Sequence, residues 1–229
     1  MTYSAVVFDF FGTLTPSIPG HVWDEHAARS SEPLGIPAAR WREALDASFP
    51  ERALGSLGDL ESSFRALAGR CGVEPDTDAL AAACANRIAS QLEIFGLRED
   101  ALSTIAALRD RGLRVGVLSD CTSELAESWS TLPLSKHVDA VVFSCAEGRR
   151  KPDRHLFEAI ATRLGVPAAE CLYIGDGGGY ELTGARGYGM TPYMLRASDW
   201  YDNDAYSRED DWAGPYVDAL SAVVDLATD

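Results

Sequence analysis

Side chains able to bind or attack a charged substrate follow four apolar runs of the sequence, at the end of each run or just beyond it. Asp9 ends the first run, and Ser119 and Asp120 end the second. Lys151 lies a few residues beyond the third run, and Asp176 ends the fourth. Because Lys151 is one of only two lysines beside eighteen arginines, its presence here is informative.

These side chains have complementary chemistry for phosphoryl transfer. A carboxylate such as that of Asp9 can attack phosphorus and form an aspartyl-phosphate intermediate. A second carboxylate, from Asp176, would repel the phosphate unless a hard cation were present, and Mg²⁺ prefers one or two carboxylates together with substrate oxygens. The Lys151 amine and the Ser119 hydroxyl can hold the phosphoryl oxygens that are not transferred. The residues therefore predict a Mg²⁺-dependent phosphohydrolase.

The elements that position these residues are predicted from hydrophobic patterning. Nearly continuous apolar runs are typical of strands buried on both faces of a parallel sheet. We predict five such strands, at Ala5–Phe10, Arg114–Ser119, Ala140–Cys145, Cys171–Asp176 and Thr191–Arg196. Amphipathic patterns predict helices at Ala101–Arg111, Asp153–Leu164 and Tyr216–Leu226. The alternation predicts an α/β fold with a doubly wound parallel sheet, in which ligands bind beyond the carboxyl ends of the strands.

A long helical segment separates the first predicted strand from the second. We predict a helical cap over residues 20–95, inserted into a core formed by residues 1–19 and 96–229, with hinges at Pro16–Gly20 and Phe95–Arg98. Two apolar helix faces support this interpretation, one of Leu60, Phe64, Leu67 and Cys71 and one of Leu80, Cys84, Ile88 and Leu92. Candidate substrate contacts in the cap, with packing or surface exposure as the alternative for each, are Trp23, Arg40, Trp41 and Arg52.

Composition narrows the class of protein. The net charge of −15 argues against nucleic-acid binding, which needs a basic face, but a few local cations can still hold a phosphate. The chain lacks the roughly 18 consecutive apolar residues of a membrane span and opens with no export leader, so we expect a cytoplasmic enzyme without a membrane partner. Its five cysteines are scattered and have no metal-type spacing. The acidic, aromatic Ser198–Gly214 segment is predicted to be an ordered loop packed on the core.

With these motifs in order, the chain resembles the haloacid dehalogenase superfamily, which contains many phosphatases. The motifs are FDFFGTLT, VLSD, RKPD and YIGDGGGYE. The resemblance implies that Asp9 is the nucleophile and that Thr13 helps to orient it. It also implies that Asp9, Asp176 and the backbone carbonyl of Phe11 bind Mg²⁺.

The same resemblance implies roles for the remaining motif residues. Ser119 and Lys151 would bind the phosphoryl group of a small phosphorylated substrate. Glu181 would lie close to the metal without necessarily binding it, or would simply favour the start of a helix. Asp120 would line the substrate pocket or form a turn, and Thr13 and Ser119 have the alternative of plain turn hydroxyls.

Phe11 departs from the family pattern. Most phosphatases of the family have an aspartate here that protonates the leaving group, a function typically worth ~10²–10⁴ in rate. One interpretation is a phosphohydrolase whose leaving group needs no acid, or which uses another group such as His21. A second is a 2-haloacid dehalogenase, and a third is a non-catalytic phosphate-binding module. A phosphonate-cleaving enzyme with a cap lysine is disfavoured, because residues 20–95 contain no lysine.

Overall fold

A six-stranded parallel sheet forms the centre of the protein. The structure, a computed structural model, describes residues 3–199 and 208–227. The strand order is β3-β2-β1-β4-β5-β6, with every pair parallel. The bounds are β1 Ala5–Phe8, β2 Arg114–Ser119, β3 Ala140–Phe143, β4 Cys171–Gly175, β5 Thr191–Leu195 and β6 Tyr216–Val217. The predicted doubly wound α/β fold is confirmed.

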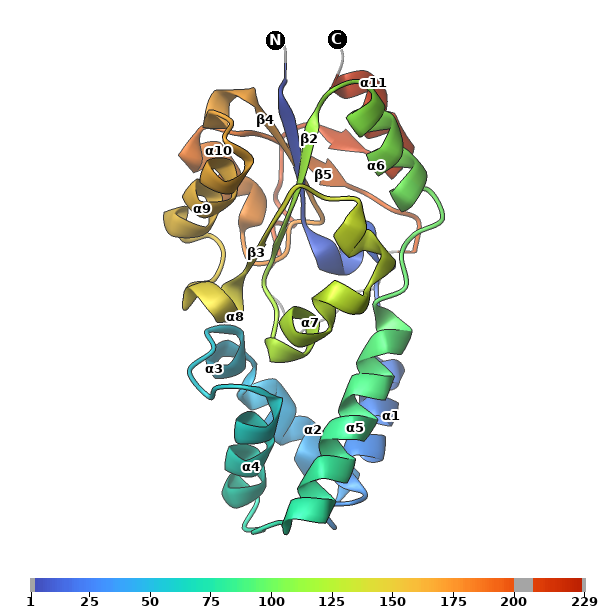
Figure 1. Ribbon diagram of the computed structural model, residues 1–229, viewed down its shortest axis with the longest axis vertical. Coiled ribbons are helices and arrows are strands. Elements are labelled where there is room, and N and C mark those ends of the chain that lie inside the picture. Colours follow the sequence, from blue (N-terminus) through green and yellow to red (C-terminus); the bar gives the residue numbers. More distant parts are fainter. Residues whose placement is uncertain (1–2, 200–207, 228–229) are drawn as a thin grey trace.

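Helices cover both faces of the sheet (Figure 1). Alternate residues of β1 point to opposite faces, so that Val6 and Phe8 join one apolar cluster and Ala5 and Val7 join the other. The first cluster includes side chains of α6 (Ala101–Asp110) and α11 (Val223–Leu226). The second includes side chains of α9 (Arg154–Leu164) and α10 (Glu181–Tyr188). Burial on both faces explains why the strand sequences are continuously apolar rather than alternating.

The first five α-helices after β1 form a separate bundle beyond the carboxyl ends of the strands (Figure 1). They have their own apolar cluster, which is centred on Trp41, Phe64 and Leu67. Aspartates cap two of them, because Asp59 accepts a hydrogen bond from the Ser62 amide and the Asp76 side chain caps the next helix in the same way. The helices are α1 Gly20–Ser31, α2 Ala38–Ala47, α3 Phe49–Ala53, α4 Leu60–Arg70 and α5 Thr77–Ile94.

Two short helices complete the rim of the sheet. They are α7 (Ser123–Ser128), which follows β2, and α8 (Ser144–Glu147), which follows β3. The prediction of a strand up to Cys145 is therefore wrong at its end. The Ser144 hydroxyl accepts a hydrogen bond from the Cys121 amide and donates one to the Cys121 carbonyl, at 2.9 and 3.2 Å. These side-chain bonds connect the segment after β3 to the segment after β2, at a point where the two strands no longer pair.

The C-terminal segment also differs from its prediction as a single helix. Tyr216–Val217 forms the edge strand β6, which pairs with β5, and the Arg196 amide just after β5 donates to the Val217 carbonyl at 2.8 Å. Only a short turn at Leu220–Ala222 and then α11 are helical. The sequence pattern does not distinguish this strand from the helix that follows, because two strand residues are too few to show the alternation of a strand.

The two predicted cap-helix faces have different outcomes. On α4 the predicted residues Leu60, Phe64 and Leu67 are buried, as is Cys71 just beyond the helix. On α5 the prediction is wrong in part, because Leu92 is 45% exposed and the buried positions include Arg87 and Gln91. The cause is a buried ion pair between Arg87 and Glu124 of α7, which turns this polar part of the helix inward.

Among the described residues, no helix is both long and apolar enough to cross a membrane.

Candidate active site

The carboxyl ends of neighbouring strands bring the predicted residues together. Asp9 follows β1, Ser119 ends β2, and Asp176 follows β4, while Lys151 comes from the loop between α8 and α9. Asp9, Ser119 and Lys151 are all buried. Parallel pairing of β1 with both β2 and β4 places these strand ends side by side, so residues more than 100 positions apart share one rim.

Lys151 links the nucleophile candidate to Glu181. Its Nζ donates to Asp9 Oδ1 at 2.6 Å and also donates to Glu181 Oε2. Glu181 is the first residue of α10, and its carboxylate also accepts the Tyr173 hydroxyl and the Gly177 amide, at 2.8 and 2.9 Å. Burial alone lowers the pKa of Lys151, but the Asp9 and Glu181 carboxylates outweigh burial and hold that pKa well above its ordinary value. Lys151 is therefore a fixed ammonium group beside Asp9.

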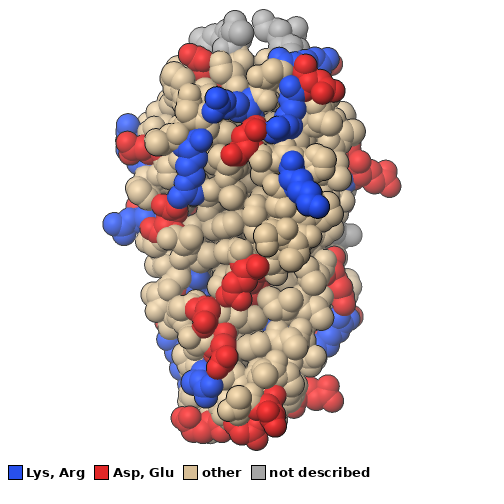
Figure 2. Space-filling view, in the orientation of Figure 1, with Lys and Arg blue, Asp and Glu red and all other residues tan. Residues whose placement is uncertain are grey.

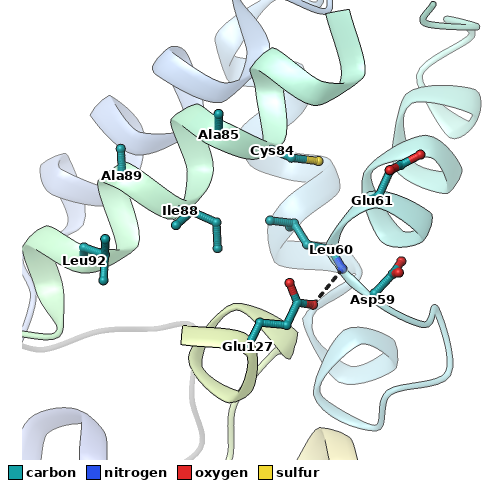
Figure 3. A pocket seen from close by; sticks show the side chains of 9 residues that line it. All are labelled: Asp59, Leu60, Glu61, Cys84, Ala85, Ile88, Ala89, Leu92 and Glu127. Carbon is teal, nitrogen blue, oxygen red and sulfur yellow. Dashed lines mark hydrogen bonds between the residues drawn. The ribbon is translucent and has the colours of Figure 1, made fainter. Parts of the chain in front are cut away.

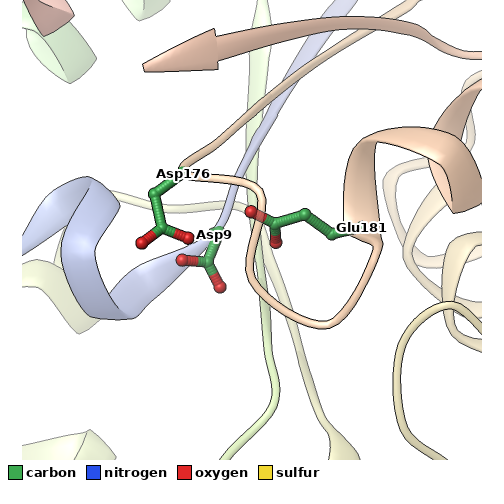
Figure 4. A group of neighbouring side chains, drawn as sticks. All are labelled: Asp9, Asp176 and Glu181. Carbon is green, nitrogen blue, oxygen red and sulfur yellow. The ribbon is translucent and has the colours of Figure 1, made fainter. Parts of the chain in front are cut away.

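A cluster of three carboxylates could hold a cation. Oxygens of Asp9, Asp176 and Glu181 all lie within 4.8 Å of one another. Figure 4 shows the Asp9 and Asp176 carboxylates pointing toward each other, with Glu181 reaching the same point from the start of α10. Burial raises the pKa of Asp176, and the neighbouring Asp9 carboxylate raises it further. A divalent cation would remove this repulsion, so the residues present fit a Mg²⁺ site.

Gly12 makes room for this arrangement. The chain turns sharply after Asp9, and Gly12 has a positive φ of 75°, which favours glycine. A Cβ atom at Gly12 would lie 2.5 Å from Asp176 Oδ2. Any larger residue would therefore displace the carboxylate that faces Asp9. The predicted strand end at Phe10 is corrected by this turn, since β1 ends at Phe8 and a helical turn covers Phe10–Leu14.

Two hydroxyls at the rim have no protein partner in the described part of the chain. Thr13 Oγ1 and Ser119 Oγ are both buried, and neither makes a hydrogen bond there. A buried polar group without a partner typically costs about 1–3 kcal/mol. Such groups are expected where a ligand supplies the missing hydrogen bond. Thr13 lies in the turn that follows Asp9, and Ser119 ends the neighbouring strand β2.

Asp120 anchors the loop that carries Lys151. Its carboxylate accepts the Lys151 amide at 3.0 Å and the Arg150 Nε at 3.2 Å. The Arg150 guanidinium in turn lies over the ring of Phe49 in α3, 4.9 Å from the ring centroid. The structure thus gives Asp120 a role in holding the Lys151 loop, beside the predicted turn-forming and pocket-lining interpretations.

Phe11 and His21 lie in different surroundings, the first among aromatic rings and the second exposed. The Phe11 ring packs against Phe10 and Phe95, with ring centroids 5.0 and 6.0 Å apart. Its side chain thus belongs to a group of aromatic rings at the edge of the core cluster. His21 is exposed near the start of α1.

The four cap candidates separate into different environments. Trp41 is buried within the bundle and donates its Nε1 to Ser30 Oγ at 3.0 Å, so it is a packing residue. Arg52 is buried against Glu124 of α7. Trp23 is half-buried and packs, as Phe11 does, against the first apolar cluster of the core, whereas Arg40 is exposed. Of these four, Trp23 is the side chain that packs against the apolar cluster of the core.

Sequence reasoning missed two contributors to the rim. Tyr173 lies within β4 and appears in the sequence as an ordinary strand residue, yet its hydroxyl binds Glu181. Arg208 pairs with Asp176, at 3.1 Å between Nη2 and Oδ2. The only available signal for Arg208 was a lone arginine within the acidic Ser198–Gly214 segment. In that segment Trp212 is buried as predicted, while Trp200, Tyr201 and Tyr206 lie outside the described residues.

One of two cavities lies beside this rim, and the other lies away from it. One, of about 530 Å³, is a groove between α4, α5 and α7, whose lining includes Asp59, Leu92 and Glu127 (Figure 3). Its lining residues are not those of the rim, so we do not assign chemistry to it. The other, of about 380 Å³, lies beside Asp176 and Arg208. Figure 2 shows that acidic side chains predominate over the half of this face formed by the bundle, in keeping with the net charge of −15.

Similarity to known proteins agrees with this geometry. The chain is 27% identical over 211 residues to a glyceraldehyde 3-phosphate phosphatase of Methanopyrus kandleri, covering 90% of this chain and 89% of that protein. It is also 27% identical over 241 residues to a ribulose-1,5-bisphosphate 5-phosphatase of Halopiger xanaduensis, covering 98% and 99%.

A solved structure shares the fold. The L-2-haloacid dehalogenase of Xanthobacter autotrophicus superimposes with a TM-score of 0.64 at 22% identity, over 98% of both chains. The family model described as haloacid dehalogenase-like hydrolase matches residues 3–189, which include Asp9, Ser119, Lys151 and Asp176. With this match over most of its length, the chain belongs to the haloacid dehalogenase-like hydrolases.

Proposed function

We propose that the protein is a Mg²⁺-dependent phosphohydrolase that acts on a small phosphorylated metabolite through an aspartyl-phosphate intermediate at Asp9. The observation that carries the proposal is the pair of facing carboxylates, Asp9 and Asp176, beside the Lys151 ammonium group. Two carboxylates this close repel one another, and a site that binds a cation and then a phosphate gives that arrangement a purpose. The names of the two relatives make phosphorylated aldehydes and sugars the first compounds to test.

Asp9, Asp176 and the Phe11 carbonyl would hold the metal. Glu181 is already committed to Lys151, Tyr173 and the Gly177 amide, so it would support the site without binding the cation directly. A bound Mg²⁺ would supply a positive charge that draws the phosphate toward Asp9 and offsets charge on its oxygens.

The protein's own groups would position the phosphate for attack. Lys151 holds Asp9 Oδ1, which leaves the other oxygen of that carboxylate to attack phosphorus. The phosphorus–oxygen bond to the leaving group breaks as the bond to Asp9 forms, and water later hydrolyses the acyl phosphate. The unpartnered Ser119 hydroxyl would donate to a phosphoryl oxygen, and the Thr13 hydroxyl would help to orient Asp9.

The helical bundle of residues 20–95 would act as a cap over the core of residues 1–19 and 96–229. The separate apolar clusters of the bundle and the core support this division, and polar contacts join the two parts. Arg87 and Arg52 of the bundle reach Glu124 of the core, and the Leu60 amide donates to Glu127 at 3.1 Å. A cap held this way would exclude water from the rim while a small substrate reacts.

A second candidate, 2-haloacid dehalogenase activity, is favoured by Phe11. Such a reaction needs no acid at this position, because halide leaves as an anion. The Asp176 carboxylate argues against it, since a second negative charge beside Asp9 would repel the carboxylate of a 2-haloacid.

One screen tests both candidates. Phosphate release is measured from acyl phosphates, phosphorylated aldehydes, phosphorylated sugars and simple alkyl phosphates, and halide release from 2-haloacids, each with Mg²⁺ and with EDTA. We expect phosphate release that requires Mg²⁺ and is lost in Asp9→Asn. Halide release that is indifferent to EDTA would instead establish the dehalogenase. A folded protein that binds phosphate but turns over none of these compounds would be the non-catalytic module.

A further inference from the structure

A segment near the C-terminus returns to the loop that carries Asp176. Arg208 forms an antiparallel bridge with Gly178, and the Glu209 amide donates to the Gly177 carbonyl at 3.1 Å. Arg208 Nη2 donates to the Asp176 backbone carbonyl at 2.9 Å and lies 3.1 Å from Asp176 Oδ2. The Arg208 guanidinium is therefore fixed to both the main chain and the side chain of a proposed metal ligand.

Glu209, the next residue, holds this segment against the start of α10. Its carboxylate accepts the amides of Leu182 and Thr183 at 2.7 and 2.9 Å, in the first turn of α10. Glu209 is buried, so these bonds are shielded from water. Because its neighbour in sequence caps a helix, Arg208 can leave Asp176 only by changing its own side-chain conformation. The contacts of this segment therefore hold the positive charge of Arg208 beside Asp176.

The Asp176 carboxylate has a defined orientation as a result. Oδ1 accepts the Gly178 amide at 2.9 Å, and Oδ2 pairs with Arg208. Each carboxylate oxygen still has a lone pair that these bonds leave open. Fixed orientation favours metal binding, but a guanidinium this close to a proposed metal ligand also repels a divalent cation.

A count of formal charges shows what Arg208 changes. The rim has three carboxylates, Asp9, Asp176 and Glu181, and two cations, Lys151 and Arg208, which leaves a formal charge of −1. Mg²⁺ would bring this charge to +1, which attracts a phosphate dianion. Without Arg208 the same site would have a formal charge of −2 before Mg²⁺ and zero after it, so it would hold the cation more tightly and the phosphate less tightly.

We propose that Arg208 is a positioning residue that sets this balance: through Asp176 it weakens Mg²⁺ binding and strengthens phosphate binding to the Mg²⁺-loaded site. The inference rests on the proposed function, because it takes Asp176 to be a metal ligand. It assigns a role to the acidic loop that the sequence pattern left without one. Removal of the Arg208 charge should therefore change the Mg²⁺ and phosphate affinities in opposite directions, which loss of structure alone would not produce.

The test uses calorimetric titration of the full chain, first with MgCl₂ and then with inorganic phosphate at saturating Mg²⁺. Arg208→Gln should bind Mg²⁺ about tenfold more tightly and phosphate about tenfold more weakly than the wild type, since one unit charge is removed a few ångströms from both. Arg208→Lys, which keeps the charge, should stay within about threefold of the wild type for both ligands. Arg186→Gln is the matched control, because it removes an arginine charge from an exposed position on α10, where Arg186 stacks on Trp212, and should change neither affinity.

The possible outcomes separate this inference from the proposed function. Weaker binding of both ligands in Arg208→Gln, or no change in either, would overturn the inference while leaving the phosphohydrolase proposal intact. A lysine variant that behaves like the glutamine variant would overturn it as well. A folded wild type that takes up no Mg²⁺ would overturn the proposed function and the inference together. Should Arg208→Gln not fold, Arg208→Met also removes the charge and carries the same expected pair of changes.

Discussion

The buried Glu124 carboxylate offers a sharp test of how the helical bundle is held to the core. Its Oε1 accepts Arg87 Nε at 2.9 Å and lies 3.5 Å from Arg52 Nη1, and all three side chains are buried. Glu124→Gln keeps the shape of the side chain but removes its charge. Two buried guanidinium groups then face a neutral amide, and loss of one partner of a buried pair typically destabilises a protein by about 3–5 kcal/mol.

The pKa of Glu124 gives a second route to this magnitude. Burial by itself raises that pKa, but the charges of Arg87 and Arg52 outweigh burial and lower it from 4.5 to about 2. At about 1.4 kcal/mol per pKa unit, the lowering corresponds to roughly 3 kcal/mol of stability. Because the folded-state pKa is depressed, this contribution is fully present above about pH 5 and is lost as the pH falls toward 2.

The assay is urea unfolding followed by far-UV circular dichroism. At pH 7 we expect the free energy of unfolding of Glu124→Gln to be about 3 kcal/mol below that of the wild type. The difference should shrink as the pH is lowered from 5 toward 2. Glu61→Gln, which removes an exposed carboxylate paired with Arg65 on α4, is the matched control and should leave stability unchanged. A loss below about 1 kcal/mol, or a difference that does not depend on pH, would refute the reasoning.

Four further predictions concern the rim. Asp9→Asn should abolish phosphate release while leaving the circular dichroism spectrum unchanged, and substantial turnover by the folded variant would exclude the covalent mechanism. EDTA should stop hydrolysis and added Mg²⁺ restore it; activity that survives exhaustive chelation would contradict the metal site. Lys151→Ala should lose about 10²-fold or more in rate, along with phosphate affinity measured by calorimetry, and a variant with unchanged phosphate binding would remove Lys151 from the site. Phe11→Asp should accelerate alkyl phosphates more than acyl phosphates, whereas a wild type that hydrolyses alkyl phosphates at about 10 per second must possess another acid.

The sequence alone determined the central strands of the sheet and most of the rim. Continuous apolar runs identified β1, β2 and β4 because strands buried on both faces need them. The residue that ends each run is then placed automatically, since parallel strands bring their carboxyl ends to one edge. That is why Asp9, Ser119 and Asp176 could be grouped without any contact being known. The fold class needed no more than this alternation of strands and helices.

Local patterns were insufficient where an element is short or polar. The edge strand β6 has two residues, and its existence depends on backbone groups of β5 that need partners. The buried side of α5 includes Arg87 and Gln91, which a hydrophobic pattern assigns to solvent. Their burial is possible only because Glu124, 37 positions from Arg87, supplies the opposite charge.

Only the tertiary structure decided the electrostatics of the rim. The sequence predicts that Asp176 follows a strand, but it contains no signal that Arg208, 32 positions later, pairs with it. A lone arginine in an acidic loop has no period and no spacing rule, and its partner depends on where the returning chain passes. The Tyr173 hydroxyl at Glu181 likewise depends on which face of β4 that side chain takes. Apolar periodicity is a local property of the chain, whereas the balance of charge at a site is the sum of groups from distant segments, and folding alone brings those together.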